Sequence, residues 1–306
     1  MYDCVIVGGG PAGLSAALML GRARRNTLVL DAGAPRNAAS HALHGFLTRD
    51  GISPAEFLAV ARRELERYET VTLRNARVES VDPIEGGFRI QLTGGPAIEA
   101  QTVVLATGVV DDLPALPGLE DCYGTSAHHC PYCDGWEHRD KPIAVHGHGD
   151  TAADYALRLL RWSATITLCS NGPARLGPES AAALTRHGIV VREEEIRRLD
   201  VVGGRLQRVV LDQGDPVEAE ALFLCLGHEL RSDILAALGV TLMESGVADA
   251  ARSGATNVDG VFAIGDASRD PQFVVTAAAE GAAAAVAINE RLTRAALDGG
   301  RSPHPG

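Results

Sequence analysis

Two cysteines three positions apart, Cys130 and Cys133, are the residues in this sequence that most clearly suggest chemistry. Their spacing suits an intramolecular disulfide that opens and closes by exchange with another thiol. A helix N-terminus or a protonated histidine beside such a pair would stabilise a thiolate. Residues that could act there as acid or base lie close in the sequence, namely Asp134, His128, His129 and His138. The pattern predicts a dithiol/disulfide redox site.

Zinc binding by the same cysteines together with the nearby histidines is the competing interpretation. A closed tetrahedral zinc site usually needs a second pair of ligands, and the sequence offers none, so we expect no metal. The other cysteines lie in or beside apolar runs, where we expect small buried side chains: Cys4, Cys122, Cys169 and Cys225.

A glycine-rich turn near the N-terminus predicts a dinucleotide site. Gly8, Gly10 and Gly13 follow the strand-like run Cys4–Val7 and precede an Ala/Leu-rich helical segment. The helical segment is expected from Leu14 to Arg22. Glycines let the backbone approach a pyrophosphate, whose charge the helix N-terminus favours, and we expect Pro11 and Ala12 between them to contact the dinucleotide as well. Asp31 follows about twenty residues on, at the end of the next strand, where a carboxylate can bind ribose hydroxyls.

A second turn repeats this pattern less completely. Gly147, Gly149 and Ala152, with Asp150 and Thr151 between them, again lie between a strand and a helix. The following strand ends in Cys169 instead of an acidic residue, and Arg175 is the only basic residue of the loop. NAD(P)H binding and a degenerate unit that only carries the cysteine pair therefore both remain open.

The strand, glycine turn, helix and strand occur twice, which predicts an α/β fold of two Rossmann-like, doubly wound FAD/NAD(P)-binding domains, the second inserted into the first. We expect residues 1–113 and 228–306 to form the first domain. Residues 114–227 would form the second and carry the cysteine pair.

Composition excludes several classes of function. The net charge of −11 argues against nucleic acid and anionic membrane surfaces as partners. The longest apolar stretch, Val274 to Ile288, is interrupted by Glu280 and is too short to cross a bilayer. The N-terminus shows no secretory signal, so we expect a cytoplasmic protein.

Over nearly its whole length, the chain resembles the low-molecular-weight thioredoxin reductase family. The similarity lies in the two glycine turns, Thr107-Gly108, the cysteine pair with Asp134-Gly135, and Gly260 to Asp266. It implies FAD, a homodimer, and a thioredoxin-like or small dithiol partner. By position, Cys133 would face the flavin, Cys130 would exchange with substrate, and Asp134 would be the acid/base, with His129 beside it. FAD contacts are further implied at Thr107, Gly108, Gly265, Asp266, Phe273 and Val274.

Within this family, three segments are similar to the branch of gliotoxin- and holomycin-type dithiol oxidases. These are the stretch from Arg36 to Gly51, Trp136-Glu137, and Glu280-Gly281. The first of them adds Arg36, Asn37 and His44 to the implied cofactor contacts. Enzymes of that branch need no NADPH, whereas thioredoxin reductases carry a basic cluster where this chain has Cys169-Ser170-Asn171. That branch often has histidine at the position of Asp134.

These observations predict an FAD-dependent oxidoreductase that exchanges electrons between flavin and Cys130-Cys133 and oxidises a dithiol with oxygen as acceptor. One alternative is an NAD(P)H-dependent reductase of thioredoxin or a small disulfide. Another, from a different class, is a flavin-containing redox sensor without turnover.

Overall fold

The computed structural model describes residues 1–300 and 302. The last residues of the segment 228–306, which we expect to complete the first domain, therefore lie outside the described residues. These residues form two compact units. Unit 1 contains Met1–Ala38, Ala55–Val110 and the chain from His228 onward, and unit 2 contains Ala39–Pro54 and Asp111–Gly227.

The excursion Ala39–Pro54 belongs to unit 2, whereas we expected it in the first domain. Its backbone passes so close to Gly124 that a Cβ atom there would lie 2.2 Å from the carbonyl oxygen of Ala39. The ring of His41 also bonds to the hydroxyl of Thr125 at 2.9 Å. These contacts, and not the order along the chain, determine where the excursion packs.

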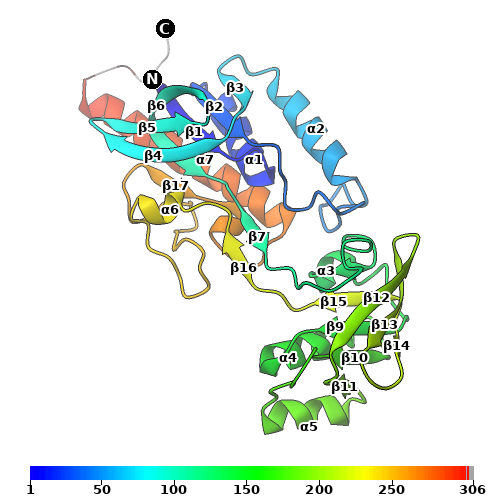
Figure 1. The fold of residues 1–306 in the computed structure, drawn as a ribbon. Coiled ribbons are helices and arrows are strands. Elements are labelled where there is room, and N and C mark those ends of the chain that lie inside the picture. The colour runs from blue at the N-terminus through cyan, green and yellow to red at the C-terminus, as the bar shows by residue number, and fades with distance from the viewer. Residues whose placement is uncertain (301, 303–306) are drawn as a thin grey trace. The chain divides into compact units, whose positions relative to one another are not determined.

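Unit 1 is built on a seven-stranded sheet in the order β3-β2-β1-β6-β5-β4, with β17 also paired to β6 (Figure 1). The first half of β6 runs antiparallel to β5, and its second half lies parallel between β1 and β17. The buried apolar side chains of β1 and β2 are typical of a parallel sheet covered on both faces. The strands are β1 (Tyr2–Val7), β2 (Thr27–Asp31), β3 (Val71–Asn75), β4 (Val78–Ile84), β5 (Gly87–Leu92), β6 (Gly95–Leu105) and β17 (Val261–Ala263).

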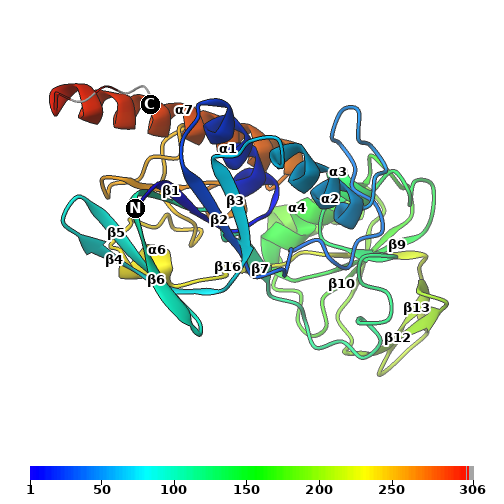
Figure 2. The same cartoon turned by 90° about the horizontal axis from the view of Figure 1, so that it is seen from above.

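Two helices of unit 1, α1 (Pro11–Arg22) and α7 (Val274–Asp298), lie side by side (Figures 1 and 2). The contact is close because its residues are small: a Cβ atom on Gly281 would lie 2.1 Å from the carbonyl oxygen of Ala12. The unit also contains α2 (Pro54–Leu65), α6 (Ile234–Ala237) and the 3₁₀ turn η1 (Gly265–Ala267). Within the described part of the chain, no helix has the length and apolar character needed to cross a membrane.

Unit 2 contains a five-stranded parallel sheet in the order β11-β10-β9-β15-β8 and a three-stranded antiparallel sheet, β12-β13-β14. Its strands are β8 (Ala127–His128), β9 (Ile143–His146), β10 (Ile166–Cys169), β11 (Val190–Arg192), β12 (Ile196–Val202), β13 (Arg205–Leu211), β14 (Val217–Glu218) and β15 (Ala221–Leu224). Its helices are α3 (Pro131–Asp134), α4 (Gly149–Leu159) and α5 (Pro178–Arg186).

Besides the excursion Ala39–Pro54, the chain passes into unit 2 and back through β7 (Val109–Asp111) and β16 (His228–Leu230), which pair with each other. Both units have the strand–turn–helix–strand order that the sequence predicts. The predicted fold class, two Rossmann-like α/β domains, is confirmed.

Candidate active site

Cys130 and Cys133 form a disulfide at the start of α3. Cys130 is the residue before the helix, and its sulfur accepts a hydrogen bond from the backbone N–H of Cys133 at 3.1 Å. Pro131 begins the helix at a position where no N–H donor is needed. Both cysteines are only partly buried, so the pair is accessible to a thiol.

Asp134, the last residue of α3, contacts one of a pair of buried histidines. Its Oδ1 atom lies 3.3 Å from Nδ1 of His128. Nε2 of His128 in turn bonds to Nε2 of His138 at 3.0 Å, and both imidazoles are buried. The structure therefore joins three of the residues that the sequence offered as acid or base.

His129, the fourth of those residues, is held separately by two tyrosines. Its Nδ1 atom bonds to the hydroxyl of Tyr123 at 3.1 Å, and its carbonyl oxygen accepts from the hydroxyl of Tyr155 at 2.9 Å. Neither tyrosine was predicted from the sequence, because each lies on another segment and neither has a motif of its own.

The remaining cysteines do not form disulfides. Cys4, Cys122 and Cys169 are buried, as predicted, and Cys225 is half-buried. Burial raises the pKa of the Cys4 and Cys169 thiols to about 12 and that of Cys122 to about 11. Since the thiolate is the reactive form, these side chains are poor nucleophiles.

The first glycine turn is a tight connection between β1 and α1. A Cβ atom on Gly8 would lie 2.2 Å from the carbonyl oxygen of Ala106, and one on Gly13 would lie 2.0 Å from that of Gly8. Gly10, in contrast, faces open space, with no atom within 4 Å of a Cβ position. The turn therefore needs glycine for packing at two positions and leaves the third free for close approach of a ligand.

Acidic and basic residues meet at two places around this turn. Asp31, at the end of β2, forms an ion pair with Arg62 of α2 at 2.7 Å and accepts from the backbone N–H of Gly33. Arg36 forms an ion pair with Asp266 at 2.9 Å and also donates to Gln272. The predicted residues Arg36 and Asp266, 230 positions apart, thus come together.

Glu280 of α7 supports the segment that carries Asp266. Its Oε2 atom accepts from the backbone N–H of Gly265 at 2.7 Å and from the hydroxyl of Ser268 at 3.0 Å. Its Oε1 atom lies 2.7 Å from the guanidinium of Arg269. In the sequence Glu280 stood out as the charged residue within an apolar stretch and as part of a resemblance, but its partners could not be predicted because they lie more than ten residues away.

The residues of unit 1 fit an FAD molecule by three observations. The N-cap residues of α1 and α7, Gly10 and Phe273, form no side-chain capping hydrogen bond, so the first turn of α1 and the N-terminus of α7 at Phe273 and Val274 are suited to an anionic group. The hydroxyl of Thr107 is buried and has no hydrogen-bond partner among the described residues. Gly108 and Gly265 both have positive φ, at 67° and 71°, which suits backbone that turns around a ligand.

His44 and Asn37, also expected as cofactor contacts, lie in different units. His44 is in unit 2, where its Nδ1 atom lies 3.5 Å from Asp50 and its Nε2 atom 3.6 Å from Glu137. Asn37 stays in unit 1 beside Arg36.

Residues of the second glycine turn form hydrogen bonds with the loop that follows β10. The backbone N–H of Gly149 donates to the carbonyl oxygen of Ala174 at 2.7 Å. The carboxylate of Asp150, in the first turn of α4, accepts from the N–H of Gly177 at 2.8 Å. Ala152 is buried beside Gly147, whereas Thr151 and Arg175 are exposed.

The loop after β10 is also occupied by bonds within unit 2. The hydroxyl of Ser170 donates to the carbonyl oxygens of Gly172 and Arg192, and the amide oxygen of Asn171 accepts from the N–H of Ile196 at 2.6 Å. Cys169, at the strand end where unit 1 has Asp31, is fully buried. The strand end thus lacks the acidic residue that unit 1 has there as the expected ribose contact, and Arg175 is the exposed basic residue of the loop.

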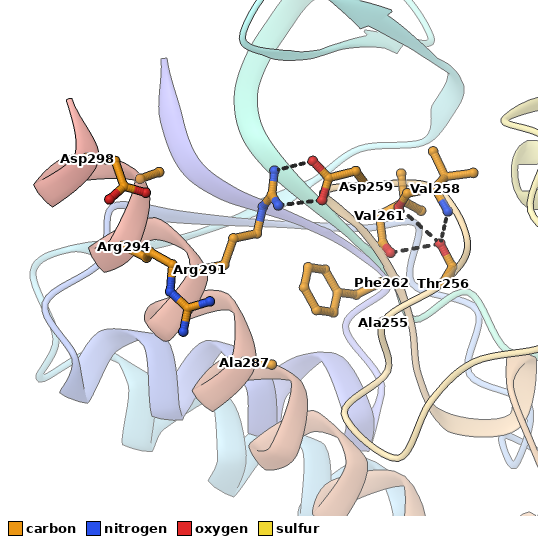
Figure 3. A pocket seen from close by; sticks show the side chains of 12 residues that line it. Ala255, Thr256, Val258, Asp259, Val261, Phe262, Ala287, Arg291, Arg294 and Asp298 are labelled. Carbon is orange, nitrogen blue, oxygen red and sulfur yellow. Dashed lines mark hydrogen bonds and ion pairs between the residues drawn. The ribbon is translucent and has the colours of Figure 1, made fainter.

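A cavity of about 460 Å³ in unit 1 lies along the C-terminal half of α7 and contains none of the predicted site residues. Figure 3 shows that Arg291 reaches across to Asp259 with two hydrogen bonds, and that Thr256 bonds to the backbone at Val258 and Val261. Polar side chains that line the cavity, Arg291, Asp259 and Thr256, are thus bonded to other residues of unit 1. We do not assign the active site to this cavity.

The chain is similar to known redox enzymes over nearly its whole length. It is 33% identical to the thioredoxin reductase aclD of Aspergillus oryzae, over 95% of this chain and 96% of that protein. Among solved structures, HlmI is 36% identical with a TM-score of 0.92, covering 98% of this chain and 95% of HlmI. An oxidoreductase from Agrobacterium tumefaciens is 34% identical with a TM-score of 0.89, covering 96% of this chain and 99% of that one.

Residues 2–281 match the family described as pyridine nucleotide-disulphide oxidoreductase. The match spans both glycine turns and the Cys130–Cys133 disulfide, and the family implies FAD. Together with the identities above, these findings make the protein a flavin-dependent disulfide oxidoreductase of the thioredoxin reductase type. The chain therefore belongs to the pyridine nucleotide-disulphide oxidoreductase family.

Proposed function

We propose that this enzyme is an FAD-dependent dithiol oxidase that closes a disulfide in a small dithiol and uses oxygen as the electron acceptor. The observation that carries the proposal is the second glycine turn. The N–H of Gly149 is bonded to the carbonyl oxygen of Ala174, and the carboxylate of Asp150, in the first turn of α4, accepts from the N–H of Gly177. A pyrophosphate would compete with Ala174 for the N–H of Gly149, and its negative charge would be opposed by that of Asp150.

The sequence similarity to dithiol oxidases supports the same conclusion. It rests on the segment around Arg36, on Trp136-Glu137 and on Glu280-Gly281. Two of these segments contact residues that we propose to bind flavin: Arg36 forms an ion pair with Asp266, and Glu280 accepts from the N–H of Gly265.

The cysteine chemistry follows from the disulfide itself. One thiolate of the substrate attacks Cys130, the bond between Cys130 and Cys133 breaks, and Cys133 leaves as a thiolate. The second substrate thiol then attacks the mixed disulfide, which releases the oxidised substrate and leaves both cysteines reduced. Each cycle removes two electrons and two protons from the dithiol. Bound FAD would carry these electrons from the cysteine pair to oxygen, which is reduced to hydrogen peroxide.

Asp134 is our candidate for the group that accepts the substrate proton, because it follows Cys133 directly and lies at the end of α3. Asp31, Thr107, Asp266 and the glycine turn at Gly8 to Gly13 are our candidates for holding FAD.

A reductase of a thioredoxin-like protein is the second candidate, favoured by the names of the relatives, several of which are thioredoxin reductases. That reaction would require NADPH or NADH to reduce the flavin through unit 2. A homodimer, as implied by the family resemblance, is compatible with either function.

Anaerobic stopped-flow absorbance of the holoenzyme separates the candidates. We expect dithiothreitol to bleach the flavin and NADPH and NADH to leave it oxidised. Cys130→Ser and Cys133→Ser should each prevent bleaching by the dithiol. Admission of oxygen should then restore the flavin spectrum with one hydrogen peroxide per dithiol.

Rapid bleaching by NADPH would overturn the oxidase proposal in favour of the reductase. Bleaching by neither nucleotide nor dithiol, with a disulfide that still opens and closes, would instead favour a redox sensor without turnover.

A further inference from the structure

Two histidines are buried directly behind Asp134 and are not used by the chemistry described above. His128 lies on β8 and His138 follows α3, and their side chains are only 7% and 6% exposed. The ring of Phe223 on β15 packs against both, with ring centroids 5.7 and 6.2 Å away. Burying two imidazoles beside an aromatic ring is costly unless their polar atoms are satisfied.

The contacts of this pair favour one assignment of protons to the ring nitrogens. Nδ1 of His128 faces the Asp134 carboxylate at 3.3 Å, which favours an N–H there. Nε2 of His128 is then the acceptor, so the N–H of the 3.0 Å bond belongs to Nε2 of His138. In this arrangement of the neutral pair both contacts of His128 are favourable, and Nδ1 of His138 remains a buried acceptor without a partner among the described residues.

An extra proton disturbs this arrangement. If His128 gained a proton on Nε2, His138 would have to move its own proton to Nδ1, a buried atom without a partner among the described residues. Burial lowers the pKa of His138 to about 4; a charge on His128 and the charges of Lys141 and Arg205 act in the same direction, and Asp134 opposes them. His138 is therefore neutral at ordinary pH.

We propose that His138 is a positioning residue that fixes the tautomer of His128, so that His128 presents an N–H to Asp134 and holds it as the ionised base for thiol–disulfide exchange. The inference rests on the proposed function of Asp134. His138 acts through His128 and touches neither the disulfide nor the substrate in this scheme.

The proton balance of the step is simple. A substrate thiol gives its proton to the Asp134 carboxylate, and the resulting thiolate attacks Cys130 while Cys133 departs as thiolate. An N–H donor at His128 stabilises the carboxylate form of Asp134 relative to its protonated form. Without that N–H the carboxylate is less stabilised, and we expect the exchange step to slow first at acidic pH.

The first experiment compares two variants at position 138. Gln can still donate an N–H to Nε2 of His128, whereas Met has a similar size and no donor. The measurement is the pH dependence of flavin bleaching by dithiothreitol in the anaerobic holoenzyme. We expect His138→Met to move the acidic limb of the profile up by about one pH unit, a tenfold lower rate below the midpoint, and His138→Gln to keep the wild-type limb.

A control and a second readout separate this role from a structural one. His187→Gln, which removes an exposed histidine at the end of α5, should leave the profile unchanged. Nitrogen-15 NMR of labelled histidines should find His128 protonated at Nδ1 and His138 at Nε2, with His138 neutral down to about pH 4.

Equal acidic limbs for His138→Met and His138→Gln in folded protein would overturn the proposal, as would a His128 protonated at Nε2. The NMR result does not depend on which substrate the enzyme uses. If NADPH proved to be the electron donor, the oxidase proposal would fail while the tautomer assignment could still stand.

Discussion

The two glycine turns of this protein have similar sequences but different surroundings in the structure. In unit 1, Gly10 faces open space and β2 ends in Asp31. In unit 2, the N–H of Gly149 is bonded to Ala174, and β10 ends in the buried Cys169. A Cβ atom on Gly149 would also meet no atom within 4 Å, as on Gly10. The comparison shows that the glycine pattern predicts the turn between strand and helix, whereas the hydrogen-bond partners of the turn and the residue that ends the next strand differ between the units.

A substitution at Gly13 should have the largest effect on flavin binding and stability of those considered for the two turns. Gly13→Ala places a Cβ atom 2.0 Å from the backbone oxygen of Gly8, an overlap that only movement of α1 can relieve. We expect loss of bound flavin and destabilisation by at least about 2 kcal/mol. The flavin-to-protein absorbance ratio and urea denaturation measure both effects.

The reverse change in unit 2, Ala152→Gly, is the matched control. It should cost about 1 kcal/mol through helix propensity alone and leave the flavin content unchanged. Equal flavin loss in both variants would contradict the division of roles between the turns.

Glu280→Gln tests the support beneath Asp266 in unit 1. The variant keeps the shape of the side chain but weakens the ion pair with Arg269, so we expect a loss of about 1–3 kcal/mol and weaker flavin retention. Ser268→Ala, which removes one hydroxyl donor to the same carboxylate, should have a smaller effect. If Glu280→Gln kept its flavin as tightly as the wild type, Glu280 would not position that segment.

Acid should destabilise unit 2 through His138. Its pKa is lowered from 6.5 to about 4, so between these values the unfolded chain binds more protons than the folded one. Stability is therefore full above about pH 6.5 and decreases as pH falls towards 4, by about 1–2 kcal/mol because solvent screens part of the effect. Urea midpoints measured across this range should fall less steeply in His138→Gln, and parallel curves would argue against a buried neutral imidazole.

Asp150→Ala should have the smallest effect. Its pKa is lowered by the hydrogen bonds from the N–H of Gly177 and from Ser180, so its carboxylate stabilises the loop at neutral pH. We expect a small decrease in melting temperature and no change in bleaching by dithiothreitol. An increase in bleaching by NADPH would show that this carboxylate is what keeps the nucleotide out.

Much of the fold could be predicted from sequence because its signals are local. The strands expected to end at Asp31 and at Cys169 do end there, and the strand expected at Cys4–Val7 is Tyr2–Val7. The helix after the first glycine turn begins at Pro11. The antiparallel strands β4 and β5 carry no such signal, since their pairing depends on β6 much further along the chain.

In the candidate site, too, residues within one motif could be predicted from the sequence and contacts between distant segments could not. The cysteine pair was predicted because both residues lie in one motif, and the disulfide is present. The pairing of Asp31 with Arg62, and of His128 with His138, depends on helices and strands that meet only in the folded chain. Sequence spacing could nominate these side chains but could not predict their partners.

The insertion of unit 2 within unit 1 also has a consequence for the order of folding. The inserted chain leaves and returns at one place, where the N–H of Asp112 donates to the carbonyl oxygen of Gly227 at 3.1 Å. Most of unit 2 is thus one continuous stretch that can fold as soon as it is synthesised. Unit 1 can be completed only after β17, Asp266 and α7 have been synthesised. We therefore expect flavin to bind last, after the part of unit 2 around the redox disulfide has folded.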